Sequence, residues 1–172
     1  MSHSPRDLAF MDAALGLARR GLGRTAPNPT VAAIVVGDGH VIGRGVTQPG
    51  GRPHAERIAL DQAGAAARGA TIYVTLEPCA QRSVSGATSC TDAILAAGIS
   101  RVVIAAADPS PFAAGQGAAR LRAAGLQVVE GVRAVEARRL NLGHILRITA
   151  HRPSVSLKMA QSRDGSKPYR NC

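Results

Sequence analysis

The sequence predicts a layered α/β fold in which helices cover a mixed β-sheet. From residue 31 onward, short runs rich in β-branched residues alternate with Ala- and Leu-rich helical segments. Strands separated by helices of this length usually pair in parallel through right-handed crossovers. The turn Gly37-Asp38-Gly39 joins two of the runs directly, which predicts an antiparallel hairpin. We expect this hairpin to be the only departure from parallel pairing.

The helix that precedes the first strand begins at a recognisable signal. Ser4 is the expected N-cap residue and Pro5 occupies the first helical position, where proline is favoured because its missing N–H is not needed there. Apolar residues then recur every three or four positions, which indicates one buried face. Gly21 and Gly23 are expected to end the helix.

The remaining elements follow in chain order. We expect strands at residues 31–36, 40–46, 71–76, 101–106 and 126–129. We expect helices at residues 54–66, 90–97, 117–124 and 132–146. Residues 153–165 are expected to form one more strand that leads into a turn. This pattern predicts one domain over residues 1–150 and a tail over residues 151–172.

Composition sets limits on the class of protein. A chain of 172 residues with 45% apolar residues is long enough for one full hydrophobic core. It contains two Tyr, two Phe and no Trp, so Ala, Val, Leu and Ile must fill the interior. Aromatic surfaces on which nucleic-acid bases could stack are therefore scarce.

The net positive charge of the chain is compatible with several kinds of binding partner. The chain carries 21 Lys and Arg against 11 Asp and Glu, a net charge of +10, which would attract nucleic acid, an acidic membrane or phosphorylated metabolites. The Arg residues are scattered and form no basic arm, which favours a solvated basic surface. We do not expect the chain to bind nucleic acid.

The apolar runs and the cysteines predict where in the cell the protein is located. No apolar run approaches the length of a membrane span, so we expect no membrane contact. Three Cys residues without a charged-then-apolar leader fit a reducing cytoplasm, where thiols can bind metal. We expect Cys172, at the end of the chain, to be a spectator.

One group of residues has the chemistry of a zinc site. His54, Cys79 and Cys90 supply an imidazole and two thiols, and Glu56 supplies a carboxylate close to the His. Three protein ligands with an open fourth position are typical of a catalytic Zn²⁺, which lowers the pKa of bound water from about 15.7 to about 7. Glu56 is the candidate general acid and base.

The spacing of this group indicates a reaction. H-x-E followed by P-C-x-x-C is the signature of zinc deaminases, which replace an amino group on a ring carbon. Here ten residues separate Cys79 from Cys90 instead of two. The alternative is that His54 is a core or capping residue and that the two Cys are small apolar fillers. Pro78 directly before Cys79 favours the zinc site.

Further blocks extend the pattern over almost the whole chain. They are Thr25-Ala26-Pro27-Asn28-Pro29 and residues 51–56, 69–79, 97–99, 108–111 and 155–158. With these blocks the chain resembles the deaminase domain of the bifunctional riboflavin biosynthesis deaminase/reductase family.

The resemblance implies a fold and an activity. The fold is a cytidine deaminase-like three-layer sandwich, a five-stranded mixed sheet with helices on both faces. His54, Cys79 and Cys90 would hold Zn²⁺ and Glu56 would shuttle protons. The substrate would be a diaminopyrimidinone that carries ribose phosphate, and the protein would be a homo-oligomer. The tail resembles the start of the reductase domain, which is otherwise absent from this chain.

Four residues are candidates for substrate binding. Asn28 matches the family and could contact a ring or ribose edge, or could instead satisfy the turn between two prolines. Thr47 and Gln81 stand where relatives commonly carry His. Arg82 could bind the substrate phosphate, or could be one more surface Arg. The segment 80–89 is longer than in relatives and lacks their Pro-Pro.

Three functions are therefore open. The leading hypothesis is a zinc-dependent deaminase of the riboflavin pathway. The second is a deaminase of another nucleobase or of a tRNA adenosine, which the charge favours and the scarcity of aromatic residues disfavours. The third is a catalytically silent relative that serves assembly or regulation.

Overall fold

A five-stranded sheet forms the centre of the part of the chain that the structure describes. The computed structural model describes residues 3–81 and 88–163. The spatial order of the strands is β2-β1-β3-β4-β5. Their bounds are β1 Ala32–Gly37, β2 His40–Val46, β3 Thr71–Val74, β4 Arg101–Ile104 and β5 Gln127–Glu130. The predicted strands are present, with ends that differ by one or two residues.

The direction of β1 departs from the prediction. β1 and β2 form the expected antiparallel hairpin, and β3, β4 and β5 are parallel to one another. However, β1 is also antiparallel to β3, with Ala33 opposite Val74 and Val36 opposite Thr71. The expectation that only the hairpin breaks parallel pairing is therefore wrong. The connection from β2 to β3 passes over β1 and leaves this uniformly apolar strand between them, where both of its faces are covered.

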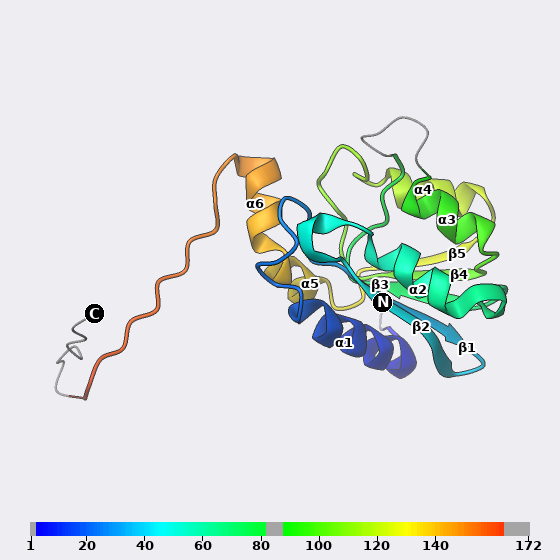
Figure 1. Ribbon diagram of the computed structural model, residues 1–172, viewed down its shortest axis with the longest axis horizontal. Coiled ribbons are helices and arrows are strands. Elements are labelled where there is room, and N and C mark those ends of the chain that lie inside the picture. The colour runs from blue at the N-terminus through cyan, green and yellow to red at the C-terminus, as the bar shows by residue number, and fades with distance from the viewer. Residues whose placement is uncertain (1–2, 82–87, 164–172) are drawn as a thin grey trace.

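Helices cover both faces of the sheet, as predicted (Figure 1). α1 contacts β1, β3 and α5 on one face, while α2 contacts β1, β2 and α3 on the other, and α3 contacts α4. Their bounds are α1 Pro5–Arg19, α2 Ala55–Ala63, α3 Cys90–Ala96, α4 Gln116–Ala123, α5 Ala134–Leu140 and α6 Leu142–Ala150. Two short 3₁₀ turns, η1 Pro49–Gly51 and η2 Gly64–Ala67, flank α2.

Two glycines fix the position of α2 against the sheet. A Cβ atom added at Gly43 would lie 2.1 Å from the Ala59 carbonyl oxygen, and one added at Gly45 would lie 2.1 Å from the Ala55 carbonyl oxygen. Both distances are far below van der Waals contact, so any side chain at these positions of β2 would push the helix away. Because His54 directly precedes α2, the glycines also set the position of the imidazole.

A buried ionic network joins α1 to the sheet. The Asp7 carboxylate accepts hydrogen bonds from Arg101 Nη1 and Nη2 at 2.8 and 2.9 Å and from the Tyr73 hydroxyl at 3.0 Å. Ser4 caps the helix as predicted, since its Oγ accepts from the Asp7 N–H at 3.1 Å. The Arg101 guanidinium lowers the pKa of Asp7 to about 2. The native state therefore stabilises the charged carboxylate.

Two further expectations are corrected. The helix expected at 132–146 is divided at Asn141, whose buried side-chain oxygen accepts a hydrogen bond from the Thr30 N–H at 3.1 Å. The strand expected at 153–165 is not present in residues 153–163, which are exposed and extend away from the body of the protein (Figure 1). A strand needs a neighbouring strand for its backbone hydrogen bonds, and the described sheet is formed by β1 to β5 without this segment. Among the described residues, no helix is both long and apolar enough to cross a membrane.

The Asp7 network predicts an acid-sensitive contribution to stability. Because folding lowers the pKa of Asp7, the contribution is complete above the ordinary carboxylate pKa of 3.8 and is lost as the pH falls toward about 2. Asp7→Asn should lower the free energy of unfolding at pH 7 by about 2 kcal/mol, measured by urea denaturation. The difference between variant and wild type should shrink at pH 2.5. An equal difference at both pH values would contradict the assignment.

Candidate active site

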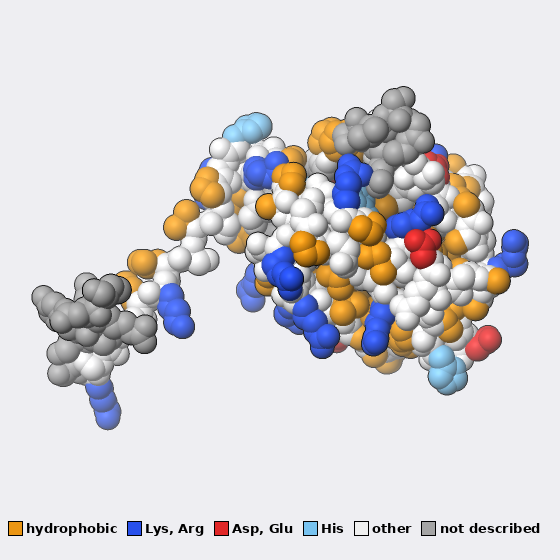
Figure 2. All heavy atoms as spheres, in the orientation of Figure 1, with side chains coloured by type: hydrophobic (Ala, Val, Ile, Leu, Met, Phe, Trp, Pro, Cys, Tyr) orange, Lys and Arg blue, Asp and Glu red, His pale blue; other side chains and the backbone are white. Residues whose placement is uncertain are grey.

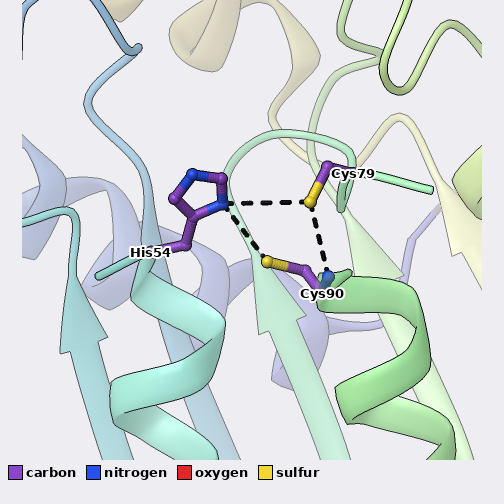
Figure 3. Close-up of side chains that lie close together, drawn as sticks. All are labelled: His54, Cys79 and Cys90. Atoms are coloured by element: carbon purple, nitrogen blue, oxygen red, sulfur yellow. Dashed lines mark hydrogen bonds between the residues drawn. The ribbon is translucent and has the colours of Figure 1, made fainter. Parts of the chain in front are cut away.

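His54 stands at the start of α2 with its side chain unused by the helix. It is the N-cap residue, with extended backbone angles of φ −71° and ψ 156°, and its side chain makes no capping hydrogen bond. The alternative that the His54 imidazole serves to cap the helix is therefore not supported, although the residue occupies the N-cap position. The imidazole is directed toward the segment that follows β3 (Figure 3).

The two thiols come from a loop and from the first turn of the next helix. Cys90 is the first residue of α3, and Ser89 and Asp92 close a capping box around it. Cys79 lies in the loop after β3, and its carbonyl oxygen accepts hydrogen bonds from the Thr91 N–H at 3.1 Å and the Thr91 hydroxyl at 3.0 Å. These bonds hold the loop against the helix start.

The three side chains converge on one point (Figure 3). His54 Nδ1 lies 3.3 Å from Cys90 Sγ and 3.9 Å from Cys79 Sγ, and the three donor atoms all lie within 4.8 Å of one another. Bonds of about 2.3 Å to sulfur and 2.0 Å to nitrogen at a tetrahedral angle separate nitrogen from sulfur by about 3.5 Å. The observed distances bracket this value, so the donor set fits a tetrahedral zinc ion.

The thiols also differ in acidity. The hydrogen bond from Cys90 lowers the pKa of Cys79 to about 4, whereas the same bond raises the pKa of Cys90 well above 9. The Cys90 backbone N–H adds a contact of 3.4 Å to Cys79 Sγ. Cys79 is therefore a thiolate at neutral pH. Metal ligands must be deprotonated, so the proton on Cys90 has to leave when a cation binds.

Glu56 is buried beside the three donors. It lies in the first turn of α2 and is 3% exposed. Burial raises the pKa of the Glu56 carboxyl because a charged carboxylate is poorly solvated there. A carboxyl group with a raised pKa holds and releases a proton closer to neutral pH, which is the property that a general acid and base requires.

Two of the donors, His54 and Cys79, line one cavity of about 330 Å³ together with Glu56. Its walls come from the segment before β1, from the loops after β3 and β4, and from α6. The lining residues are Pro27, Asn28, Pro29, Val31, Thr47, Arg52, His54, Glu56, Leu76, Glu77, Cys79, Gln81, Asp108, Ser110, Pro111, Phe112, His144, Arg147 and Ile148.

Three of the four residues predicted to bind substrate line this cavity. Asn28 donates through Nδ2 to the Gly51 carbonyl at 2.8 Å, and Gln81 donates through Nε2 to the Gln116 side chain at 3.1 Å. The Thr47 hydroxyl is buried and bonded to the Val31 backbone, accepting from its N–H at 3.1 Å. Arg82 lies outside the described residues. The substrate-binding roles of all four stay predictions.

The prediction missed a polar wall of the cavity. His144 Nε2 lies 2.9 Å from Asp108 Oδ1, and Arg147 Nη2 donates to the Pro27 carbonyl at 2.9 Å. His144 and Arg147 are three positions apart, so they share one face of α6. The three-residue spacing is visible in the sequence and predicts a shared helix face. It does not show that this face lines a cavity until the position of α6 is known.

Arg120 on α4 links the two segments that carry the thiols. Its Nη1 donates to the Ala80 carbonyl at 2.5 Å and its Nη2 to Asp92 Oδ1 at 2.5 Å. Ala80 follows Cys79, and Asp92 closes the capping box of the helix that begins at Cys90. Arg120 therefore holds together the two ends of the long segment between the thiols.

The comparisons with known proteins agree with this geometry. Residues 4–106 match the family model of the cytidine and deoxycytidylate deaminase zinc-binding region. The riboflavin biosynthesis protein RibD of Aquifex aeolicus is 49% identical over 159 residues, which are 92% of this chain and 44% of that protein. RibD of Escherichia coli is 46% identical over 93% of this chain and 43% of that protein.

A solved structure from Thermotoga maritima, titled a diaminohydroxyphosphoribosylaminopyrimidine deaminase/5-amino-6-(5-phosphoribosylamino)uracil reductase, superposes with a TM-score of 0.86. It is 43% identical, and the match covers 93% of this chain and 46% of that chain. The chain thus spans less than half the length of these relatives. The predicted resemblance and fold class are confirmed: the chain belongs to the cytidine and deoxycytidylate deaminase family and is similar over most of its length to RibD proteins.

Proposed function

We propose that this chain is a zinc-dependent deaminase of riboflavin biosynthesis. The proposed reaction is hydrolysis of the ring amino group of a 2,5-diamino-6-ribosylamino-pyrimidinone 5′-phosphate. The observation that carries the proposal is the convergence of His54 Nδ1 and the sulfur atoms of Cys79 and Cys90 beside the buried Glu56. The similarity to RibD proteins supports the choice of substrate.

The residues have distinct tasks in this proposal. His54, Cys79 and Cys90 would hold Zn²⁺, which when bound supplies activation of water at neutral pH. Glu56 takes a proton from the attacking water and delivers it to the leaving amino nitrogen. A carbon–oxygen bond forms, the carbon–nitrogen bond breaks, and ammonia leaves. The cavity walls orient the ring so that its amino-bearing carbon faces Glu56.

The role of Glu56 predicts a selective loss of activity. Glu56→Gln should lower the rate of ammonia release at least about 100-fold, because the amide cannot carry the proton. The zinc content should stay at one equivalent, because Glu56 is not among the three donors. Glu136→Gln, on the exposed surface of α5, is the control and should keep wild-type activity. A fully active Glu56→Gln protein would contradict the mechanism.

The donor set predicts dependence on metal. Treatment with a chelator should abolish ammonia release by the wild type, and added Zn²⁺ should restore it. Cys90→Ser should bind zinc more weakly, because a hydroxyl replaces a thiolate, and should not recover at the same concentration of Zn²⁺. Cys172→Ser is the control thiol variant. Full activity of the metal-free wild type would refute the zinc proposal.

The contacts of Arg120 predict its effect on metal affinity. Arg120→Gln should weaken zinc binding by about tenfold, since groups that orient metal ligands typically contribute that much or more. The measurement is competition with a chromophoric chelator. Arg122→Gln, on the same helix and paired instead with Glu130, should bind zinc like the wild type. Equal zinc affinity in all three proteins would show that Arg120 does not support the site.

The two other functions have direct tests. Purified protein unable to take up one equivalent of zinc would favour a catalytically silent relative. RNA binding that weakens steeply with salt would favour a deaminase that acts on RNA. Figure 2 shows Lys and Arg side chains distributed over the visible face between apolar and neutral ones, an arrangement that does not favour a nucleic-acid substrate.

Three expectations about the larger context stay predictions. They are the division into a deaminase domain at residues 1–150 and a reductase-like tail at residues 151–172, the homo-oligomeric state, and the cytoplasmic location. Size-exclusion chromatography with light scattering tests the oligomeric state directly.

A further inference from the structure

We propose that Arg147 on α6 binds the phosphate group of the substrate, a role for which the sequence had suggested Arg82. The inference rests on the proposed function, because only a phosphorylated substrate needs such a group. It identifies α6 as the part of the cavity that selects the phosphate ester over the free riboside.

The Arg147 guanidinium is held in place at the cavity wall. Its Nη2 donates to the Pro27 carbonyl at 2.9 Å and lies 3.5 Å from His144 Nδ1. Its Nε and Nη1 have no hydrogen-bond partner among the described residues. A guanidinium anchored at one nitrogen loses less side-chain freedom on binding a ligand. Its remaining N–H groups can donate to two oxygens of one phosphate.

His144 separates the positive charge of Arg147 from the negative charge of Asp108. One tautomer of the ring makes both contacts. In it, Nδ1 accepts from Arg147, and Nε2–H donates to Asp108 Oδ1 at 2.9 Å. The same oxygen of Asp108 also accepts from the Ser110 N–H at 2.9 Å. Asp108 therefore makes no direct ion pair with Arg147. The guanidinium keeps its charge available to the cavity.

The wall that results is acidic at one end and basic at the other. Asp108 belongs to the loop after β4, which meets the thiol-bearing segment where the Ala80 N–H donates to the Phe112 carbonyl at 2.8 Å. Arg147 lies beyond His144, on the other side of the imidazole ring. A substrate with ring amino groups at one end and a phosphate at the other matches this polarity. Arg52 also lines the cavity and adds positive charge.

The test compares Arg147→Gln with the wild type on two substrates, the 5′-phosphorylated diaminopyrimidinone riboside and its dephosphorylated form. The variant should raise KM for the phosphorylated substrate about 10- to 100-fold, the effect expected for losing a charge-assisted hydrogen bond. Its kcat should stay near the wild-type value, and its KM for the dephosphorylated form should not change. Arg147→Lys should show a smaller rise, because it keeps the charge without the planar fork.

A matched control separates this role from a general effect of charge. Arg138→Gln removes one positive charge from the exposed surface of α5, away from the cavity, and should leave both KM values unchanged. Arg82→Gln tests the competing position. A selective rise of KM in Arg82→Gln without one in Arg147→Gln would overturn the proposal. An equal rise for both substrates in Arg147→Gln would overturn it as well.

A second measurement separates failure of this inference from failure of the proposed function. Calorimetric titration of the zinc-loaded proteins with ribose 5-phosphate reports on the anion subsite without any deamination. The wild type should bind it at least about tenfold more tightly than Arg147→Gln. If the wild type deaminates neither substrate, the proposed function fails, and this titration still decides the role of Arg147. Equal binding by the two proteins would reject it.

Discussion

The structure depends on bringing one nitrogen and two sulfur atoms from three separate segments to a single point. His54 and Cys90 are 36 positions apart in the chain, yet their donor atoms lie 3.3 Å apart. The start of α2 is positioned by the close approach of the helix to Gly43 and Gly45. The start of α3 is positioned by its capping box and by Arg120. Packing by residues that do not line the cavity themselves therefore determines whether the donors can share an ion.

The residues proposed to bind substrate are organised differently from the group formed by His54, Cys79 and Cys90. Thr47 and Gln81 already use polar side-chain groups in hydrogen bonds to other residues of the protein, Val31 and Gln116. Asp108, His144 and Arg147 instead form a connected series along one wall. In the proposed function, water activation and substrate selection therefore depend on different elements of the fold, and changes in one need not disturb the other.

The three side chains that the sequence pattern grouped do lie together in the structure, because each falls at a helix start or in the loop after a strand. Contacts between distant segments were not predictable in the same way. The antiparallel pairing of β1 with β3 depends on where the β2 to β3 connection passes. The division between α5 and α6 depends on Asn141 bonding to Thr30, 111 positions earlier in the chain. Without that division, the side of α6 that meets the cavity could not be known, so His144 and Arg147 were missed.

The position of α6 couples the cavity to the extended segment of residues 151–163. The helix supplies one wall of the cavity, and the backbone continues from it without interruption into the exposed residues 151–163. α6 buries none of its own residues fully, so the sheet restrains it less than it restrains the other helices. A force on the extended segment, or binding of another molecule to it, would therefore first displace α6 and the residues of α6 that line the cavity.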